Sequence, residues 1–462
     1  MLSGLCYAQS ITWQRTYNHY PYNQSDYAFC IGQTTDGNFI VSGHDGVYNI
    51  WVIKINPYGD TIWTCTPAGG EAYALIATND GGCILTGVND SLTAFTIKIS
   101  GSGNLLWNKS YGGSDVRLYS IIKTDDGGFL ACGRDWRTNI DGLIIKIDSL
   151  GNLLWMKYYP AGFDKTLTSI INSPGGNFLV TGNDALTYGG GDPAKTLLLK
   201  LNPIGDTIWS KRLSVNNTSC VGINIVLNNN FLIITGFTGD TAVPWQNELT
   251  FIMKLDTNGN LIFAKDYTAN NNEYYMSSSV INNTIIFTTS KGYGYNHISG
   301  KVYFADMEGQ IYRQKEINDT GQVQLHAIYP ISNNDILFAG YYGFYGPTRN
   351  DYYVIRTDSL LNPPPIGVNN YSNRLPGSFT LYQNYPNPFN PKTTITFDLP
   401  KDIDIRLTVY DVLGREVYSI NEFRKSGSNM ITFDGSNLAS GVYYYSLETG
   451  TFAETRKMVL IK

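Results

Sequence analysis

Short runs of apolar residues, alternating with polar ones, recur along the chain with a period of about 50 residues. The clearest copy consists of Ser120–Gly128, Phe129–Gly133, Gly142–Ile147 and Leu153–Tyr158. We interpret these runs as four short strands, a to d, because alternating runs bounded by Gly, Asn and Asp are typical of β-strands. Tight hairpin turns are expected to join strand a to b and strand c to d.

The turn between strands c and d carries a glycine, and a large ring follows it in strand d. Glycine permits the positive φ that such a turn needs, and a ring at one place in each repeat can pack between neighbouring sheets. Repeats of this length with four strands each predict a β-propeller. The glycines are Gly59, Gly103, Gly151, Gly205, Gly259 and Gly309, and the rings are Trp63, Trp107, Trp155, Trp209, Phe263 and Tyr312.

The last repeat is incomplete at its C-terminal end. Its strand c is present at Tyr352–Arg356, but the turn glycine is missing and the chain continues into Pro363–Pro365. A segment at the other end of the chain, Ile11–Tyr17, matches strand d of the second repeat, Leu106–Tyr111, in residue class. We therefore predict a seven-bladed β-propeller over residues 10–360, with the N-terminal strand completing the last blade and leaving no free edge.

One face of this ring is predicted to carry the variable loops. The a–b and c–d turns are short and uniform, whereas the b–c and d–a connections differ between repeats and contain many aromatic residues. Variable loops on a rigid scaffold commonly bind ligands, and exposed rings suit stacking on sugars; alternatively, the rings pack down and stabilise the loops. The candidate ligand-binding residues are Trp136, Tyr188, Trp245, Tyr293, Tyr295, Tyr342 and Tyr345.

Two further repeated features have structural interpretations. Strand c carries a cation in most repeats, such as Lys54, Lys98 and Lys146. A ring of positive charge is possible, but alternation favours a solvent-facing position that pairs with turn carboxylates. The cysteines occur singly in strand-like segments without any Cys-x-x-Cys pair, which indicates small core residues rather than a zinc or redox site.

The sequence contains no recognised catalytic or metal-binding motif. The 4 histidines are scattered, and there is no His-Glu-x-x-His, no Gly-x-Ser-x-Gly and no phosphate loop. We predict no catalytic residue, metal site or cofactor, and favour a binding module for a glycan or protein. The alternatives are a polymer-acting enzyme, such as a lyase or glycosidase with paired carboxylates, and a structural surface spacer. The acids to inspect for catalysis are Asp115, Asp135, Asp184, Asp240 and Glu248.

Composition narrows the possible partners. Charged residues make up 15% of the chain and the net charge is −5, which argues against nucleic acid or an anionic membrane surface. No apolar run approaches ~18 residues, so no transmembrane segment is expected. In residues 1–9, the small residues Cys6 and Ala8 are typical of the end of a signal-peptide cleavage region.

The C-terminal part has a different pattern. Residues 361–378 are polar and Pro-rich, as in a linker. From residue 379 to 462, alternating runs predict a small Ig-like β-sandwich. This segment carries a Tyr-Pro-Asn-Pro-Phe-Asn-Pro string, two turn glycines and a basic last strand. The residues are Tyr385, Pro386, Asn387, Pro388, Phe389, Asn390, Pro391, Gly414, Gly441, Lys457 and Lys462.

Motif by motif and in order, residues 379–462 resemble the type A C-terminal sorting domain of the type IX secretion system of Bacteroidetes and their relatives. The resemblance implies that the secretion machinery recognises this segment in the periplasm and carries the protein across the outer membrane. The protein would then be secreted or held at the outer cell surface. An ordinary Ig-like or fibronectin-like appendage is the alternative. The resemblance does not identify the propeller's ligand.

Overall fold

The structure is a computed structural model. It describes residues 12–19, 24–137, 140–160, 164–185, 194–239, 249–267, 273–292, 298–317, 322–331, 335–343, 350–358, 379–384, 387–424, 427–450 and 452–461. The chain divides into two compact units, Met1–Asn370 and Tyr371–Lys462, which we describe separately. The regular elements of the described residues are all β-strands, and none of these residues belongs to a helix that could cross a membrane.

In the first unit, the described strands form seven four-stranded antiparallel sheets, which we number I to VII along the chain. Sheet I comprises β2 (Tyr27–Gln33), β3 (Phe39–His44), β4 (Ile50–Ile55) and β5 (Thr61–Cys65). Sheet II comprises β6 (Glu71–Ala77), β7 (Cys83–Val88), β8 (Ala94–Ile99) and β9 (Leu105–Tyr111). Sheet III comprises β10 (Val116–Lys123), β11 (Phe129–Asp135), β12 (Asp141–Ile147) and β13 (Leu153–Tyr159).

The remaining sheets repeat this order. Sheet IV comprises β14 (Asp164–Ser173), β15 (Asn177–Ala185), β16 (Lys195–Leu201) and β17 (Thr207–Leu213). Sheet V comprises β18 (Ser219–Asn228), β19 (Phe231–Gly239), β20 (Leu249–Asp256) and β21 (Leu261–Tyr267). Sheet VI comprises β22 (Glu273–Ile281), β23 (Thr284–Gly292), β24 (Ile298–Ala305) and β25 (Ile311–Ile317). Sheet VII comprises β26 (Gln322–Pro330), β27 (Ile336–Gly343), β28 (Asn350–Thr357) and β1 (Trp13–Tyr17).

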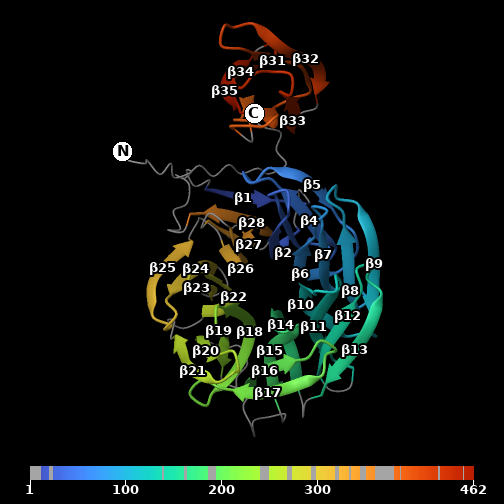
Figure 1. Ribbon diagram of the computed structural model, residues 1–462, viewed down its shortest axis with the longest axis vertical. Coiled ribbons are helices and arrows are strands. Elements are labelled where there is room, and N and C mark those ends of the chain that lie inside the picture. The colour runs from blue at the N-terminus through green and yellow to red at the C-terminus, as the bar shows by residue number, and fades with distance from the viewer. Residues whose placement is uncertain are drawn as a thin grey trace. The chain divides into compact units, whose positions relative to one another are not determined.

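The first strand of each sheet lies at its inner edge. These inner strands contact one another in chain order, and β26 of sheet VII contacts β2 of sheet I. The sheets therefore follow one another around a ring, as Figure 1 shows. The arrangement is all-β and propeller-like.

Sheet VII contains the first and the last described strands of the first unit, β1 and β28. Strand β1 pairs antiparallel with β28, with Trp13 opposite Arg356 and Tyr17 opposite Tyr352. Trp13, Tyr17 and Tyr352 belong to one apolar cluster that also includes residues of sheet I. The N-terminal strand thus occupies the outer position that strand d takes in the other sheets.

The ring in strand d packs on the next sheet. A methyl group added to Gly151 would lie 2.8 Å from Trp107 Cζ3, so only glycine leaves room for the indole. The Tyr111 hydroxyl donates a hydrogen bond to the Gly151 carbonyl at 2.7 Å, and Tyr17 makes the same bond to Gly59 at 2.6 Å. The ring–glycine pairs are Trp13–Gly59, Trp63–Gly103, Trp107–Gly151, Trp155–Gly205, Trp209–Gly259 and Phe263–Gly309.

The cations of strand c lie in a different environment from the one we expected. Lys54, Lys98 and Lys146 pair with carboxylates of the a–b turns, as predicted, whereas Lys254 lies 3.6 Å from Glu308 of a c–d turn. The hydrogen bond from Lys146 lowers the pKa of Asp126 to about 2. Solvent exposure was the wrong expectation, because the Lys54 side chain is only 3% exposed. Neighbouring sheets cover these positions, which the alternation within one strand cannot reveal. The pairs are Lys54–Asp36 (2.6 Å), Lys98–Asp80 (2.7 Å) and Lys146–Asp126 (2.7 Å).

The second unit consists of two sheets around one apolar core. The three-stranded sheet has the order β29 (Thr380–Leu381), β30 (Lys392–Leu399) and β33 (Gly427–Asp434). The four-stranded sheet has the order β32 (Glu416–Arg424), β31 (Ile403–Tyr410), β34 (Gly441–Glu448) and β35 (Ala453–Leu460). Alternate residues of both sheets, such as Phe397 and Tyr445, are fully buried in the shared core. The unit is therefore a two-layer β structure.

Candidate functional site

A β-bulge occurs at the same place in all seven sheets, between the inner strand and its neighbour. A bulge leaves one residue unpaired and redirects its side chain. The residue opposite the bulge is a glycine in six sheets, and a methyl group on Gly133, for example, would lie 1.8 Å from the Arg117 carbonyl oxygen. The unpaired residues are Phe29, Tyr73, Tyr119, Thr168, Ile223, Met276 and His326.

The bulge residues meet at the inner edge of the ring. The Phe29 ring contacts Tyr73 of sheet II, with centroids 5.9 Å apart, and His326 of sheet VII, at 5.4 Å. A side chain packed between two sheets would reach only one neighbour, so Phe29 lies where the sheets converge. Tyr73 continues the series to Tyr119 of sheet III at 5.4 Å. Four successive sheets therefore contribute a ring, whereas sheets IV to VI contribute Thr168, Ile223 and Met276.

A second tier of rings lies two residues before the bulge. Tyr27 contacts His44 on β3 and Tyr341 on β27, each with centroids 4.9 Å apart. His44 in turn stacks on Tyr48, at 5.3 Å. The Tyr27 hydroxyl accepts a hydrogen bond from Asn350 Nδ2 at 2.9 Å. We call the two tiers together the aromatic arc.

Burial and hydrogen bonding shift the pKa values of two polar groups in the arc, His326 and Tyr73. Burial lowers the pKa of His326 to about 4, and its Nε2 has no hydrogen-bond partner. The Tyr73 hydroxyl donates to the Glu71 carboxylate, and burial together with this bond raises the pKa of Tyr73. Arg117 Nη1 donates to the same hydroxyl at 3.4 Å. At neutral pH the His326 imidazole and the Tyr73 phenol are therefore neutral.

The candidate ligand-binding residues have different positions. Trp136 follows β11 at the end of the arc and is 54% exposed, with the Arg134 guanidinium 4.6 Å from its ring centroid. Tyr342 is only 6% exposed and packs against Tyr353 at 5.6 Å, so little of its ring is open to a ligand. The other five, Tyr188, Trp245, Tyr293, Tyr295 and Tyr345, lie outside the described residues.

Two of the acids considered for catalysis, Asp135 and Asp184, lie beside arginines. Asp135 is buried and binds Arg137 at 2.5 Å. Burial alone would raise its pKa, but the hydrogen bonds from Arg137 lower it below the usual value. Asp184 is 5% exposed and lies 3.4 Å from Arg212 Nε. Asp115 occupies a left-handed backbone conformation with φ of 66°, while Asp240 and Glu248 lie outside the described residues.

In the second unit, the sorting-motif residues join the start of the unit to its last strand. Phe389 is 1% exposed, and its amide donates to the Val459 carbonyl at 2.9 Å. Asn387 Oδ1 accepts from the Val459 amide at 2.8 Å. Gly414 supplies the positive φ of the β31–β32 turn. Of the remaining motif residues, Tyr385, Pro386 and Lys462 lie outside the described residues, Gly441 begins β34 and Lys457 is exposed on β35.

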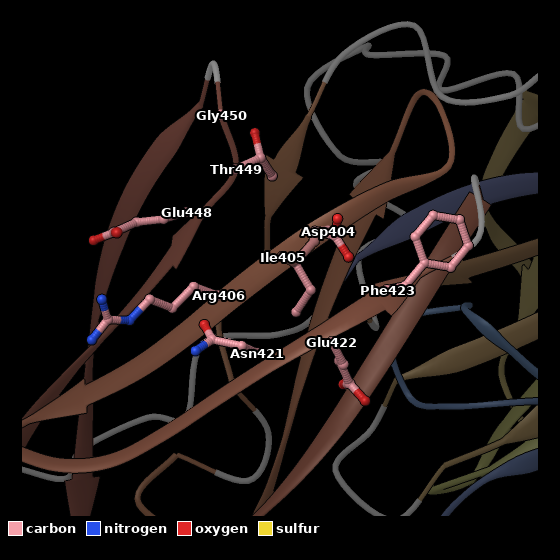
Figure 2. Close-up of a pocket in the computed structure, with 9 residues that line it drawn as sticks. All are labelled: Asp404, Ile405, Arg406, Asn421, Glu422, Phe423, Glu448, Thr449 and Gly450. Atoms are coloured by element: carbon pink, nitrogen blue, oxygen red, sulfur yellow. The ribbon is translucent and has the colours of Figure 1, made fainter.

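A shallow pocket of about 570 Å³ lies on this unit, over β31, β32 and the end of β34. Figure 2 shows its charged side chains, among them Asp404, Arg406, Glu422 and Glu448. Two of them are paired elsewhere, because Arg406 binds Glu416 at 3.0 Å and Glu422 binds Arg424. No group of acidic, histidine or cysteine residues suited to a metal occurs among the residues that the structure describes. The pocket thus has the character of a solvated sheet surface.

Comparison with known proteins identifies the second unit and the fold of the first. No curated protein sequence matches the chain. The structure of puromycin hydrolase is similar with a TM-score of 0.50 and 11% identity, covering 83% of this chain and 62% of that one. The chain thus spans less than two thirds of the hydrolase, and the likeness shows the fold alone.

Two further solved structures are similar at a lower TM-score of 0.46. A protein of unknown function from Dyadobacter fermentans is 10% identical, covering 76% of this chain and 99% of that one. The periplasmic gluconolactonase of Pseudomonas aeruginosa is 9% identical, covering 88% and 98%.

The family model described as "Secretion system C-terminal sorting domain" matches residues 383–462. This match covers the Asn387–Pro391 segment and the strand β35 with which it pairs. The C-terminal unit of this chain is therefore a sorting domain of the type IX secretion system, and the protein is exported to the cell surface or secreted.

Proposed function

We propose that the exported protein is a binding module for a glycan or a protein, with the aromatic arc and the adjacent loops as its binding face. In this proposal, sheets I to VII are the blades of a closed seven-bladed propeller, and the sorting domain is an Ig-like sandwich. The likeness to puromycin hydrolase supports a propeller-type scaffold. Secretion would place this face in contact with extracellular polymers.

The observation that carries the proposal is the unbroken series of ring contacts across four sheets. It runs from Tyr341 through Tyr27, His44, Phe29 and Tyr73 to Tyr119. The Arg134 guanidinium lies over both Tyr119 and Trp136 and so links Trp136 to this series. Rings stacked between sheets would suffice for stability, but Trp136 is 54% exposed at the end of the series. An exposed indole beside semi-buried phenols is well suited to stacking on sugar rings or on an extended peptide.

The ion pairs formed by the candidate catalytic acids favour a binding function over hydrolysis. Asp135 and Asp184 are held by Arg137 and Arg212, whereas a glycosidase needs one free carboxylate and one protonated carboxyl group. A catalytic polymer-acting enzyme remains the alternative that the same experiment would reveal, through shortening of a bound polymer. A structural spacer would bind nothing.

The test is binding of the full chain to a broad glycan array and to surface-protein extracts. The variant Trp136→Ala should lose about 5- to 30-fold in affinity, because stacking on an aromatic side chain contributes on the order of 1–2 kcal/mol. The control is Tyr312→Ala on β25, since Tyr312 is 58% exposed but lies on an outer strand. Equal losses in both variants, or no binding by the parent, would contradict the proposal.

A further inference from the structure

Two arginines lie directly opposite each other on sheet III. Arg117 on β10 is the cross-strand partner of Arg134 on β11. Opposed residues of antiparallel strands project from the same face, with Cβ atoms about 5 Å apart, and like charges at such a pair are destabilising. The opposed arginines therefore lower the stability of the sheet, so their presence needs an explanation other than folding.

The equivalent pair in the other sheets never carries two charges. This position is the one two residues before the bulge, together with its partner on the next strand. In the other sheets the pairs are Tyr27–His44, Glu71–Val88, Thr166–Asn183, Val221–Phe237, Tyr274–Ser290 and Gln324–Tyr341. The fold does not require arginine here, so the two charges are specific to sheet III.

Aromatic side chains contact both guanidinium groups. Arg134 lies over Trp136 at 4.6 Å and over Tyr119 at 5.7 Å, and its Nε is buried without a hydrogen-bond partner. Arg117 donates to the Tyr73 hydroxyl. The faces of Tyr119 and Trp136 position Arg134, the Tyr73 hydroxyl positions Arg117, and most N–H donors of both guanidinium groups stay available.

Neither guanidinium forms an ion pair with any carboxylate in the part of the chain that the structure describes. Asp135, adjacent to Arg134 in the sequence, is bound by Arg137. Glu71 reaches Arg117 only through the Tyr73 hydroxyl. Asp164 interacts electrostatically with Arg134, but its carboxyl accepts a hydrogen bond from Thr166 and burial raises its pKa. Among the described residues, the two guanidinium groups therefore carry positive charge without a direct carboxylate partner, in a protein whose net charge is −5.

We propose that Arg117 and Arg134 together bind the carboxylate of an acidic glycan, with the uronate ring stacked on Trp136. This inference rests on the proposed function and specifies its ligand. Arginine recognises carboxylates through parallel N–H donors, and the unused donors of two adjacent guanidinium groups would satisfy one carboxylate and be neutralised by it. The neighbouring indole favours a sugar carboxylate over that of an acidic peptide, because a pyranose ring presents a flat apolar face to it.

The experiment measures the affinity of the full chain for polygalacturonate and for alginate, beside fully methyl-esterified polygalacturonate. The parent should bind at least one acidic polymer, lose affinity with increasing salt, and bind the ester at least about 10-fold more weakly, as expected for the loss of charged hydrogen bonds. The double variant Arg117→Gln/Arg134→Gln should bind the acidic polymer roughly 30-fold or more weakly. Its Tm should equal or exceed that of the parent, because the repulsion between the two charges is removed.

The matched control is Lys109→Gln/Lys123→Gln, which removes two positive charges from exposed strand positions. Its affinity should remain within about twofold of the parent's, because exposed charges at a distance are screened. An equal loss in this control, unchanged affinity in the arginine variant, or equally tight binding of polyglutamate at the arginines would overturn the acidic-glycan assignment. If Trp136→Ala abolishes glycan binding while the arginine variant does not change it, only this inference fails. If the parent binds no glycan or protein, the proposed binding function of the aromatic arc is itself refuted.

Discussion

Asp26 lies at the junction of sheets I and VII and is fully buried. Its Oδ2 accepts a hydrogen bond from the His19 amide at 2.9 Å, while Oδ1 has no partner. Burial raises its pKa to about 7, and the charges of Asp351 and Asp45 add to this effect. In the unfolded chain this carboxyl would have a pKa of about 4, so the folded protein binds a proton that the unfolded chain releases.

The first prediction concerns the pH dependence of stability. Because the folded pKa is the higher one, Asp26 should reduce the free energy of unfolding as the pH rises from about 4 to about 7, by roughly 2–4 kcal/mol. In Asp26→Asn, which keeps an acceptor for the His19 amide, this loss should be absent. Chemical denaturation of both proteins between pH 4.5 and 7.5 measures it. Parallel curves for the two proteins would show that Asp26 does not titrate in this range.

At this scale the sequence predicted residue types better than residue environments. Trp136 was expected at an exposed loop position, and the structure has it there. Tyr342, chosen for the same reason, is buried against Tyr353, and the Lys54 side chain is buried in a turn contact. Alternation along one strand reports which face a side chain occupies, but burial depends on the neighbouring sheet, whose distance the sequence does not specify.

Among the elements, the repeated strands were predicted from the sequence, whereas the β-bulges were not. The four-strand period and the turn glycines placed strands a to d in most repeats, because each follows from local φ preference and alternation. The bulge that directs Phe29 and Tyr73 toward the inner edge was missed. Its signal is a second glycine, at the end of strand b, such as Gly43, Gly87 and Gly133. A glycine inside a strand indicates a bulge or close backbone approach, and the sequence repeats it in six sheets.

Strand β1 takes the place that strand d occupies in every other sheet. Trp13 packs on Gly59 as Trp107 packs on Gly151, and its indole N–H donates to the Pro57 carbonyl at 2.8 Å. Arg15 adds an ion pair with Asp60 at 2.6 Å. One short strand thus connects sheet VII with sheet I and covers the edge of β28, which would otherwise be open.

Removing this strand should therefore weaken the whole ring. Deletion of Ile11–Tyr17 is expected to lower Tm by at least about 5 °C, because the buried Trp13 alone is worth about 3–5 kcal/mol. Trp13→Ala should cost about as much as Trp107→Ala, since both indoles pack on a turn glycine. Differential scanning calorimetry compares these proteins with a chain lacking only Met1–Gln9. A Tm unchanged by the longer deletion would refute closure by β1.

At the scale of the whole molecule, function divides between the two compact units. The sorting domain was recognisable from the sequence because its most distinctive motif, Tyr385–Pro391, is a run of consecutive residues. The structure gives several of them a physical role: Asn387 and Phe389 fix β35 through the Val459 amide and carbonyl. The ligand of the ring could not be read in the same way, since the aromatic arc is assembled from single residues about 45 positions apart.

Export can be tested most directly by truncating the last strand, β35. Removing Lys457–Lys462 deletes Met458 and Leu460 from the core and the partners of Asn387 and Phe389. The sorting domain should lose its fold, and the truncated chain should accumulate in the periplasm instead of reaching the cell surface or the medium.

Cell fractionation with immunoblotting in a host that has the type IX machinery measures this distribution. Because the ring is a separate compact unit, the retained chain should keep its resistance to proteases. The substitution Lys457→Gln alters only an exposed side chain and should leave export intact. Normal export of the truncated chain would show that β35 is not needed for sorting. If Lys457→Gln blocks export as strongly as the truncation does, the lysine charge is recognised rather than the folded strand.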